Sequence, residues 1–406
     1  MKYENKKAVI FLADGMADDP QEKLNGKTPL EYAYTPGMDE IARTGINGTF
    51  LTLPDGLPTS SDVANMSVLG FQPELNYPGR GPIEAVSQGI KLADGDVAWR
   101  CNLVYVSDDG ILRDFSAGHI SDQDAAELMA AIKAEFDSPQ VTFHSGVSYR
   151  NLLVLHGKEF SADVDYFKPD SSQDLPLAEL RLSPAKKTPQ AEYTVKFLID
   201  LEEKVARFLA NHPLNAKRDV PANRIWPWSP GGNPRIDKFQ DKYGGRTGAV
   251  ISAVDVIKGI GLCSGMEVIN VPGATGFLDT NYAGKVEAAL RAIEKHDLVY
   301  IHLEAIDECS HMGDLDKKLQ AITEFDANIV VPVLEALRGK NINFAILPDH
   351  PVPVKLRQHT TTPVPLAICG SSFQPDAIGS FSEQLAPAGS LGLLRKDELV
   401  RKLLEL

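Results

Sequence analysis

The sequence predicts an α/β fold with a central, mainly parallel β-sheet flanked by helices. Three apolar runs each lead into acidic and histidine residues: Ala8–Ala13 before Asp14, Leu298–Leu303 before Asp307, and Ile342–Leu347 before Asp349. Apolar runs of this length are typical of parallel strands buried on both faces, and ligands gather where such strands end. Helix-length segments alternate with strand-like runs, at residues 38–44, 125–136, 193–211 and 283–295.

Composition limits the classes of function. The chain has 406 residues, of which 43% are hydrophobic and 24% charged, so it is globular and long enough for two or three domains. The net charge is −14 without a Lys/Arg block, which disfavours a nucleic-acid or anionic-membrane partner. A small anionic substrate is compatible with this charge, because local Arg groups and metal ions override it locally.

Cysteine usage and the N-terminus indicate a compartment. The four cysteines show no CxxC pairing, which is typical of free thiols in a reducing cytosol. The first apolar run has only six residues, too few for a signal-peptide core or a membrane span. We therefore expect a cytoplasmic protein, and the sequence leaves homo-oligomerisation open.

The middle third of the chain differs from its two ends. It combines strand-like runs at residues 97–106, 141–143 and 149–156 with a helix, and it lacks acidic-plus-His clusters. A proline-containing segment (167–189) and a Trp/Pro/Gly stretch (225–232) follow it. Because the acidic clusters lie at both ends, we expect a discontinuous core of residues 1–78 and 220–406, with a smaller α+β domain, residues 79–219, inserted into it.

Ser61 is the candidate nucleophile. It precedes Asp62 at the start of a segment with helical periodicity, where backbone N–H groups and the helix dipole favour anions. An ordinary N-cap is the commoner role for such a serine. The alternative is a hydroxyl activated by a metal ion to attack phosphorus.

The ordered combination of motifs resembles one family. The motifs are Asp14-Gly15, Ser61-Asp62-Val63-Ala64-Asn65, Asp307 with His311, Asp349-His350, and His359-Thr360 before Pro363. Their order is similar to that of the alkaline phosphatase superfamily and, within it, to the archaeal-type cofactor-independent phosphoglycerate mutases. Segments such as Gly79–Ala85, Arg100–Val104 and Ser116–Ile120 extend the resemblance over nearly the whole chain. It implies an alkaline-phosphatase-like core with a smaller inserted domain.

The resemblance also implies a site with two divalent metal ions. It assigns Asp307, His311 and His359 to one ion, and Asp14, Ser61, Asp349 and His350 to the other. Carboxylate, hydroxyl and imidazole ligands suit zinc, manganese or magnesium. His302 and Glu304 are expected to support these ligands without binding the ions. The remaining candidates, His144, His156, His212 and His296, are expected to be ordinary histidines.

Substrate groups are expected mainly in the inserted domain. Guanidinium forks suit a phosphorylated carboxylate. The candidates are Arg80, Arg100, Asn102, Arg113 and Arg150, with Arg246 and Lys258 from the core. For each arginine a solvated or ion-paired surface role is an equal alternative. Asp114 and His119 are candidates for general acid and base when the substrate hydroxyl exchanges its proton.

The resemblance implies a metal-dependent isomerase that interconverts 3-phosphoglycerate and 2-phosphoglycerate through a phosphoserine at Ser61. One departure is that Thr59-Ser60 precedes Ser61 where Pro-Gly is expected. Proposed homoserine kinases share a similar Ser-Asp-Val-Ala-Asn motif, so a kinase is the first alternative. A phosphatase or phosphodiesterase is the second. A metal-stabilised binding protein is the third, and it would need neither a nucleophile nor an open coordination position.

Overall fold

The structure is a computed structural model that describes residues 6–406. The chain forms two compact units. Unit 1 comprises Met1–Tyr77 and Ile236–Leu406, and unit 2 comprises Pro78–Arg235. We expected the inserted domain to span residues 79–219, whereas unit 2 extends to Arg235 and the chain returns to unit 1 at Ile236.

The late return has a physical reason. The Trp/Pro/Gly stretch forms strand β9 (Arg224–Gly231), which pairs antiparallel with β3 (Val97–Val106) and so belongs to unit 2. β9 contains Pro227 and Pro230, which donate no hydrogen bond. Its only described strand partner is β3, so β9 is an edge strand, where proline is tolerated.

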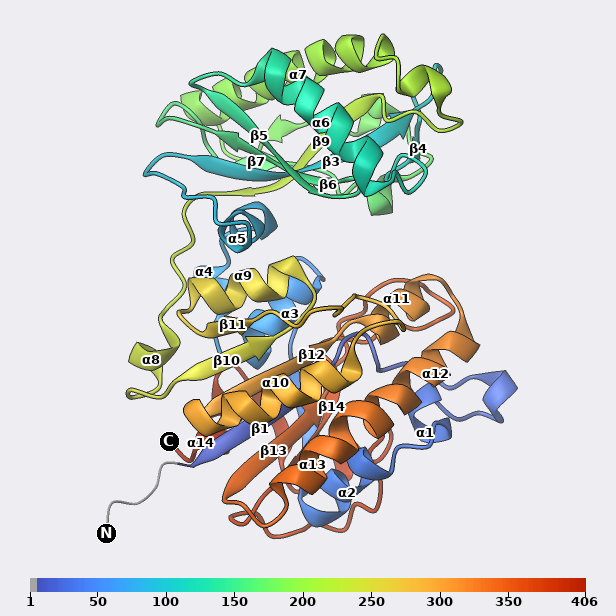
Figure 1. The fold of residues 1–406 in the computed structure, drawn as a ribbon, viewed down its shortest axis with the longest axis vertical. Helices are drawn as coiled ribbons and strands as arrows, with labels where there is room; N and C mark the ends of the chain where they lie inside the picture. The colour runs from blue at the N-terminus through green and yellow to red at the C-terminus, as the bar shows by residue number, and fades with distance from the viewer. Residues whose placement is uncertain (1–5) are drawn as a thin grey trace. The chain divides into compact units, whose positions relative to one another are not determined.

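Unit 1 is built on an eight-stranded sheet (Figure 1). Its order is β11 (Glu267–Ile269), β10 (Gly248–Ile251), β12 (Leu298–Leu303), β1 (Lys7–Ala13), β13 (Ile342–Leu347), β14 (Val364–Cys369), β2 (Ile46–Leu51) and β15 (Gly392–Arg395). The first five strands are mutually parallel, and β14 is antiparallel to both of its neighbours. The predicted α/β class with a mainly parallel sheet is therefore confirmed.

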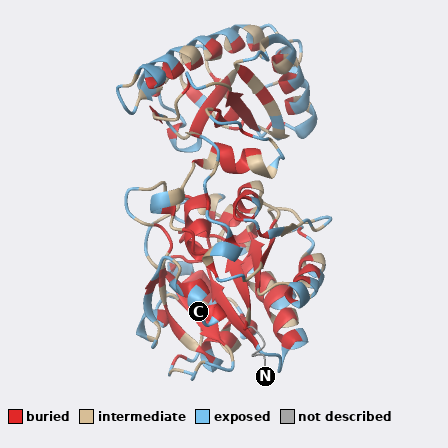
Figure 2. Ribbon diagram, turned by 90° about the vertical axis from the view of Figure 1, so that its left-hand side faces the viewer, coloured by how far each residue is buried: buried red, intermediate tan, exposed pale blue. Residues whose placement is uncertain are grey.

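Helices cover the sheet of unit 1. They are α1 (Pro29–Tyr32), α2 (Pro36–Thr44), α3 (Ser61–Val68), α4 (Pro73–Asn76), α8 (Phe239–Lys242), α9 (Asp255–Cys263), α10 (Tyr282–Lys295), α11 (Ala305–His311), α12 (Leu315–Phe325), α13 (Val331–Leu337) and α14 (Glu398–Leu404). Short 3₁₀ turns lie at Glu22–Leu24 and Ala386–Ala388, and a π-helical turn, Asp326–Val330, joins α12 to α13. The central strands β12, β1 and β13 are buried almost throughout, and Figure 2 shows buried strands in the middle of this unit.

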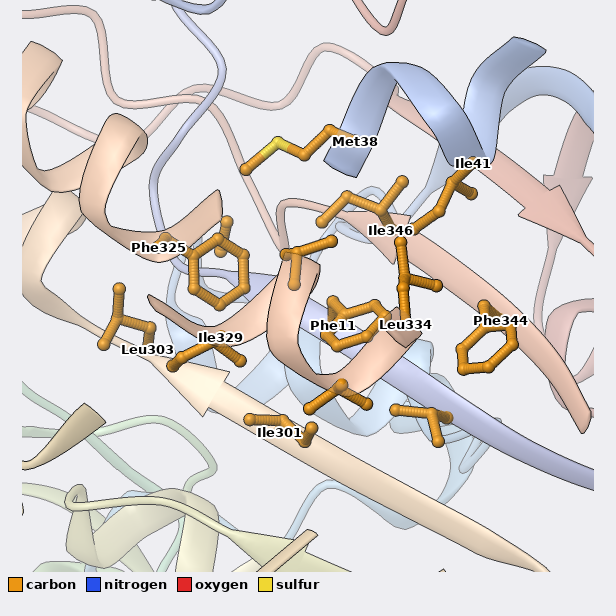
Figure 3. Packing of buried hydrophobic residues seen from close by; sticks show 14 of the residues in the cluster. Phe11, Met38, Ile41, Ile301, Leu303, Phe325, Ile329, Leu334, Phe344 and Ile346 are labelled. Atoms are coloured by element: carbon orange, nitrogen blue, oxygen red, sulfur yellow. The ribbon is translucent and has the colours of Figure 1, made fainter. Parts of the chain in front are cut away.

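The core of unit 1 explains the continuous apolar strands. Alternate residues of β1, Val9, Phe11 and Ala13, join one cluster with side chains of α2, α10, α12 and α13. Figure 3 shows Phe11 and Phe344 within this cluster, and their rings stack with centroids 6.2 Å apart. The intervening residues of β1 are equally buried on the opposite face. Burial on both faces fixes the register of β1, and hence the position of Asp14 directly after it.

Unit 2 is a smaller α+β unit. A five-stranded sheet contains β3, β4 (Leu112–Asp114), β5 (Val141–Val147), β6 (Arg150–Leu155) and β9, with a two-stranded pair of β7 (Val164–Asp165) and β8 (Ser183–Pro184). Its helices are α5 (Arg80–Ser87), α6 (Asp122–Phe136) and α7 (Pro189–Ala210), with 3₁₀ turns at Asp170–Ser172, Leu177–Glu179 and Asn215–Lys217. Apolar residues of α6, α7 and the sheet form its core. No helix within residues 6–406 is long and apolar enough to cross a membrane.

A buried carboxylate caps helix α2. The Asp326 carboxylate accepts hydrogen bonds from the N–H groups of Gly37 at 3.0 Å and Met38 at 2.7 Å, whereas the N-cap residue Thr35 makes no side-chain bond. Asp326→Ala should lower the free energy of unfolding by about 1–3 kcal/mol, because two buried N–H groups lose their acceptor. Asp326→Asn retains one acceptor oxygen and should cost less. Chemical denaturation of the three proteins measures both differences.

The same comparison has a defined pH dependence. Burial raises the pKa of Asp326 to about 6, against the opposing effect of the two N–H donors, from an unfolded value of about 3.9. Because the folded state binds this proton more tightly, the parent protein loses stability from Asp326 as the pH rises from about 4 to 7. Asp326→Asn has no titrating carboxyl at this position. The difference in free energy of unfolding between the parent protein and Asp326→Asn should therefore shrink between pH 5 and pH 7.5. A difference that grows over this range would contradict the assignment.

Candidate metal centre and nucleophile

The acidic and histidine residues predicted as metal ligands meet at one edge of the unit 1 sheet. Asp14 follows β1, Asp307 lies on α11 after β12, and Asp349 and His350 follow β13. These three strands are adjacent and parallel, so their carboxyl ends share an edge. Ligand atoms of Asp307, His311 and His359 lie within 4.8 Å of one another, and so do those of Asp14, Asp307 and His350. Asp307 belongs to both groups and therefore links them.

The side chains of Asp307, His311 and His359 direct their ligand atoms toward one another. The Nε2 atoms of His311 and His359 face each other at 2.8 Å, and both lie close to the Asp307 carboxylate, at 3.3 and 3.6 Å. The Nδ1–H of His311 donates to the backbone carbonyl of Arg357 at 2.9 Å, which directs the Nε2 lone pair toward Asp307. This arrangement of nitrogen and oxygen atoms fits a bound divalent ion.

The second group converges on His350. Its Nε2 atom lies 3.1 Å from Ser61 Oγ, 3.3 Å from Asp349 Oδ2 and 3.5 Å from Asp14 Oδ1. Asp14 Oδ1 and Asp307 Oδ1 are buried and have no hydrogen-bond partner among the described residues. Buried carboxylate oxygens without a donor are costly, and a cation would satisfy both. The residues present therefore fit a pair of divalent ions.

Ser61 occupies the first position of helix α3. Ser60 is the N-cap residue, and its hydroxyl makes no capping bond. The Ser61 hydroxyl faces His350 instead, so the N-cap role that sequence statistics favour for Ser61 is not the one in the structure. Ser61 is half-buried, whereas Ser60 is buried and its hydroxyl is directed to the Pro58 carbonyl at 3.4 Å.

The electrostatics of the cluster reflect its excess of buried carboxylates. Burial, together with the charges of Asp349 and Asp307, raises the pKa of Asp14 well above its ordinary value. Burial likewise raises the pKa of Asp349 to about 7. Burial opposes ionisation of His311 too, but its hydrogen bond to Asp307, the charge of Asp307 and the hydrogen bond to the Arg357 carbonyl together outweigh burial and raise the pKa of His311 to about 9. Protons thus compensate part of the charge that cations would compensate, and metal binding would release them.

His302 and Lys318 orient the ligands. The Ser252 hydroxyl lies 3.2 Å from His302 Nδ1, and His302 Nε2 lies 3.1 Å from Asp14 Oδ2. A neutral His302 that donates from Nε2 leaves Asp14 Oδ1 for an ion, and burial does lower the pKa of His302 to about 3. Lys318 is fully buried and donates to the Gly15 and Val352 carbonyls and to Asp18. No sequence pattern distinguished Lys318, because buried lysines are rare.

A second polar group lies in unit 2. Arg80 and Arg100 both bind the buried carboxylate of Glu84, with Arg80 Nε at 2.7 Å. Burial lowers the pKa of Arg100, and so do the charges of Arg80 and Arg150, against the opposing charge of Glu84. Arg100 also lies over the Trp228 ring at 5.1 Å. This excess of positive charge suits an anion.

Asn102, Asp114 and His119 lie on connected elements of unit 2. Asn102 is buried, opposite Arg150 in the β3–β6 register, and accepts from the Trp228 indole N–H at 3.0 Å. The Ser116 hydroxyl donates to Asp114 at 2.7 Å and accepts from the His119 N–H at 3.0 Å. Residues 117–119 all have positive φ, between 49° and 71°, and His119 is exposed. Strained loops of this kind cluster at functional sites, although strain alone assigns no role.

Three further candidates lie elsewhere. Arg246 precedes β10 and binds Asp297, which precedes β12, at 3.3 Å. It therefore sits at the amino edge of the parallel strands, opposite the metal ligands, which does not support substrate binding by Arg246, and that role stays a prediction. Arg113 is exposed and paired with Asp109 and Asp174. Lys258 lies in the first turn of α9, which follows the carboxyl end of β10, so it remains a candidate.

The remaining histidines behave as ordinary side chains. His144 and His156 both lie within 3.0 Å of the Thr142 hydroxyl, and His296 pairs with Glu267. Neither metal-ligand group among residues 6–406 includes them or His212. Glu304 lies close enough to Asp14 to raise its pKa, in agreement with a supporting position.

Gly15 allows the close approach of Asp14 and Asp307. Its φ is +66°, and an added Cβ would lie 2.7 Å from Asp307 Oδ1 and 2.8 Å from Asp307 Cα. Gly15→Ala should therefore displace Asp307 and weaken Mn²⁺ binding roughly tenfold or more, measured by calorimetry. Gly26 is the matched control, because its φ is +80° but nothing lies within 4 Å of an added Cβ. Gly26→Ala tests backbone strain alone and should leave Mn²⁺ affinity unchanged; equal losses in both variants would contradict the steric argument.

Comparison with known proteins gives one consistent result. A family model described as 2,3-bisphosphoglycerate-independent phosphoglycerate mutase matches residues 42–215. The chain is 43% identical to the protein of that name from Methanothrix thermoacetophila, over 100% of both chains. It is 43% identical to a probable 2,3-bisphosphoglycerate-independent phosphoglycerate mutase from Geobacter sulfurreducens, over 98% of this chain and 97% of that one.

Solved structures agree with the sequence relatives. A Pyrococcus horikoshii protein superposes with a TM-score of 0.82 at 26% identity, covering 99% of this chain and 97% of that one. The cofactor-independent phosphoglycerate mutase of Thermoplasma acidophilum gives a TM-score of 0.65 at 28% identity, covering 98% and 99%. The full-length identity, the shared fold and the ligand cluster lead to one conclusion: this chain belongs to the 2,3-bisphosphoglycerate-independent phosphoglycerate mutase family.

Proposed function

We propose that this chain interconverts 3-phosphoglycerate and 2-phosphoglycerate, without added bisphosphoglycerate, through a phosphoserine at Ser61. The observation that carries the proposal is the contact of Ser61 Oγ with His350 Nε2 at 3.1 Å, inside a cluster of buried carboxylates and imidazoles. The name shared by its full-length relatives indicates the substrate.

The chain's residues divide the proposed reaction between them. Ser61 Oγ forms a bond to phosphorus as the bond from phosphorus to the substrate oxygen breaks. Its place at the start of α3 directs backbone N–H groups toward the anionic phosphoryl group. In the return step the other hydroxyl of the glycerate takes the phosphoryl group from Ser61, which regenerates the serine.

Two divalent cations complete the proposed site. Asp307, His311 and His359 would hold one ion, and Asp14, Ser61, Asp349 and His350 would hold the other, with Asp307 close to both. When bound, the ions would supply charge neutralisation for the phosphoryl oxygens and favour the deprotonated form of the serine. Manganese, zinc and magnesium all suit this mixed set of oxygen and nitrogen ligands.

The arginine group of unit 2 is the proposed binding site for the glycerate. Arg80 and Arg100 beside Glu84, and Arg150, whose charge acts on Arg100, would present guanidinium groups to the substrate carboxylate. We propose that Asn102 orients this group, and that Asp114 and His119 exchange the proton of the reacting hydroxyl. Lys258 and Arg113 remain predictions with weaker support, since each is already paired with a carboxylate.

The proposed setting is the cytoplasm. The four cysteines are buried free thiols, as proteins of reducing compartments have. A small phosphorylated carboxylate is the only partner that the site chemistry requires. The absence of a nucleic-acid partner and the possibility of a homo-oligomer stay predictions.

Replacement of Ser61 tests the nucleophile. Ser61→Ala should lower kcat roughly 10⁴-fold or more, because the covalent step is lost while the aspartate and histidine ligands remain. Ser60→Ala is the matched control and should change kcat by less than about tenfold, because its hydroxyl is directed away from His350. Steady-state assays of both variants give the comparison. Near-normal turnover in Ser61→Ala, with an inactive Ser60→Ala, would show that the register is wrong.

A substrate panel tests the reaction. The purified protein with Mn²⁺ should convert 3-phosphoglycerate to 2-phosphoglycerate, detected through an enolase-coupled assay, and lose this activity in excess chelator. It should release little inorganic phosphate and transfer none from ATP to homoserine. Homoserine phosphorylation at a higher kcat/KM than isomerisation would establish the kinase alternative. Full isomerase activity after verified metal removal would refute the metal assignment.

A further inference from the structure

A chain of hydrogen bonds connects strand β12 to the nucleophile and to a metal-ligand carboxylate. The hydroxyl of Tyr300, on β12, donates to Asn65 Oδ1, on α3. The Asn65 amide nitrogen donates to Asp349 Oδ2 at 2.8 Å and to the backbone carbonyl of Ser61 at 2.8 Å. Tyr300, Asn65 and Asp349 are all completely buried.

The orientation of the Asn65 amide is determined by its neighbours. Its NH₂ group faces two acceptors, the Asp349 carboxylate and the Ser61 carbonyl, which offer no proton. A rotated amide would place its oxygen against both acceptors and its NH₂ against the tyrosine hydroxyl. Because Asn65 and Asp349 are completely buried, that arrangement would leave the Asp349 carboxylate without the donor that it now has.

Asn65 also determines which lone pairs of Asp349 remain for an ion. Asp349 Oδ1 accepts from the N–H groups of Gly15 at 3.1 Å and His350 at 2.8 Å, which uses both of its lone pairs. Asp349 Oδ2 accepts one hydrogen bond, from Asn65, and lies 3.3 Å from His350 Nε2. One lone pair is left on Oδ2, on the side where Ser61 Oγ and His350 meet.

We propose that Asn65 and Tyr300 are positioning residues that hold Asp349 and the first turn of α3 in one register. The Asn65 amide connects the Asp349 carboxylate to the backbone carbonyl of Ser61. Asp349 and Ser61 are therefore held next to each other only when the amide donates to both. Tyr300 fixes the amide from the opposite side. The kinetic part of this inference rests on the proposed phosphoryl transfer, whereas the metal-binding part does not.

The strands and helices involved explain why such a link is needed. Asp349 is positioned by β13 and the following turn, whereas Ser61 is positioned by α3. These two parts of the chain are far apart in sequence, since 284 residues separate Asn65 from Asp349. The sheet fixes Asp349 and Tyr300 relative to each other through β13, β1 and β12, because β1 pairs with both other strands. The bonds of Asn65 extend that fixed frame to the helix that carries the nucleophile.

Metal binding provides the first test. Apo-protein titrated with MnCl₂ by calorimetry should show affinity about 10–100-fold weaker in Asn65→Leu, which keeps the approximate volume and removes the donor. Tyr300→Phe should weaken affinity by a smaller factor, roughly threefold to tenfold. Asn65→Asp should be the most damaging at neutral pH, because it sets a second carboxylate against Asp349.

Tyr243→Phe is the matched control. Tyr243 is a buried tyrosine of unit 1 whose hydroxyl donates to the Leu69 carbonyl at 3.3 Å, away from the metal ligands. It loses one buried hydrogen bond, as Tyr300→Phe does, but should bind Mn²⁺ like the parent. If Asn65→Leu fails to fold, the isosteric pair Tyr300→Phe and Tyr243→Phe still decides the result, with thermal unfolding of the apo-proteins compared.

The kinetic test separates positioning from substrate binding. Tyr300→Phe and Asn65→Leu should lower kcat and the rate at which Ser61 becomes phosphorylated, while KM for 3-phosphoglycerate changes by less than about twofold. Parent-like Mn²⁺ affinity in both folded variants, or an equal loss in Tyr243→Phe, would overturn the inference. Weakened Mn²⁺ binding in variants of a parent that does not isomerise phosphoglycerate would support the positioning role and refute the proposed function instead.

Discussion

The main physical constraint on unit 1 is the electrostatic repulsion between buried carboxylates at the carboxyl edge of its sheet, which the rest of the fold must offset. Asp14, Asp307 and Asp349 are each almost completely buried, and two of their oxygens have no hydrogen-bond partner among residues 6–406. Three ionised carboxylates this close are strongly unfavourable in a protein interior, so the ion-free protein must hold protons that it would release to cations. The raised pKa of Asp14, caused by burial and by its acidic neighbours, expresses this requirement. Divalent ions would turn the most costly feature of the fold into a favourable one.

The surrounding fold counteracts this repulsion with rigid, local contacts. Parallel pairing of β1 with β12 and β13 sets the spacing of the three acidic residues, because each follows the end of a strand buried on both faces. Gly15 allows the turn that follows β1 to approach Asp307, and the Lys318 ammonium donates a hydrogen bond to the Gly15 carbonyl. His302 takes one oxygen of Asp14, while Asn65 takes one oxygen of Asp349. Asp14 therefore keeps Oδ1 available for an ion, and Asp349 keeps one lone pair on Oδ2.

Much of this arrangement follows from sequence patterns. The runs Leu298–Leu303 and Ile342–Leu347 match β12 and β13 residue for residue, since strands buried on both faces leave a continuous apolar pattern. Pairings between distant residues were not predictable. β9 contains two prolines, which are rare in strands, and it belongs to unit 2 because it pairs with β3. Sequence also does not reveal which edge of the sheet an arginine occupies, and Arg246 lies at the edge opposite the metal ligands. Tyr300 looks like an ordinary apolar strand residue, and only the contact with Asn65 distinguishes it.

The central claim is that the acidic cluster holds two divalent ions that share Asp307. Metal stoichiometry of the purified protein, by inductively coupled plasma mass spectrometry after equilibration with Mn²⁺ and removal of free ion, tests it most directly. The account predicts two ions per chain in the parent protein. It also predicts fewer than one in Asp307→Ala, because Asp307 contributes to both ligand groups. Two ions retained by a folded Asp307→Ala variant, or none bound by the parent, would contradict it.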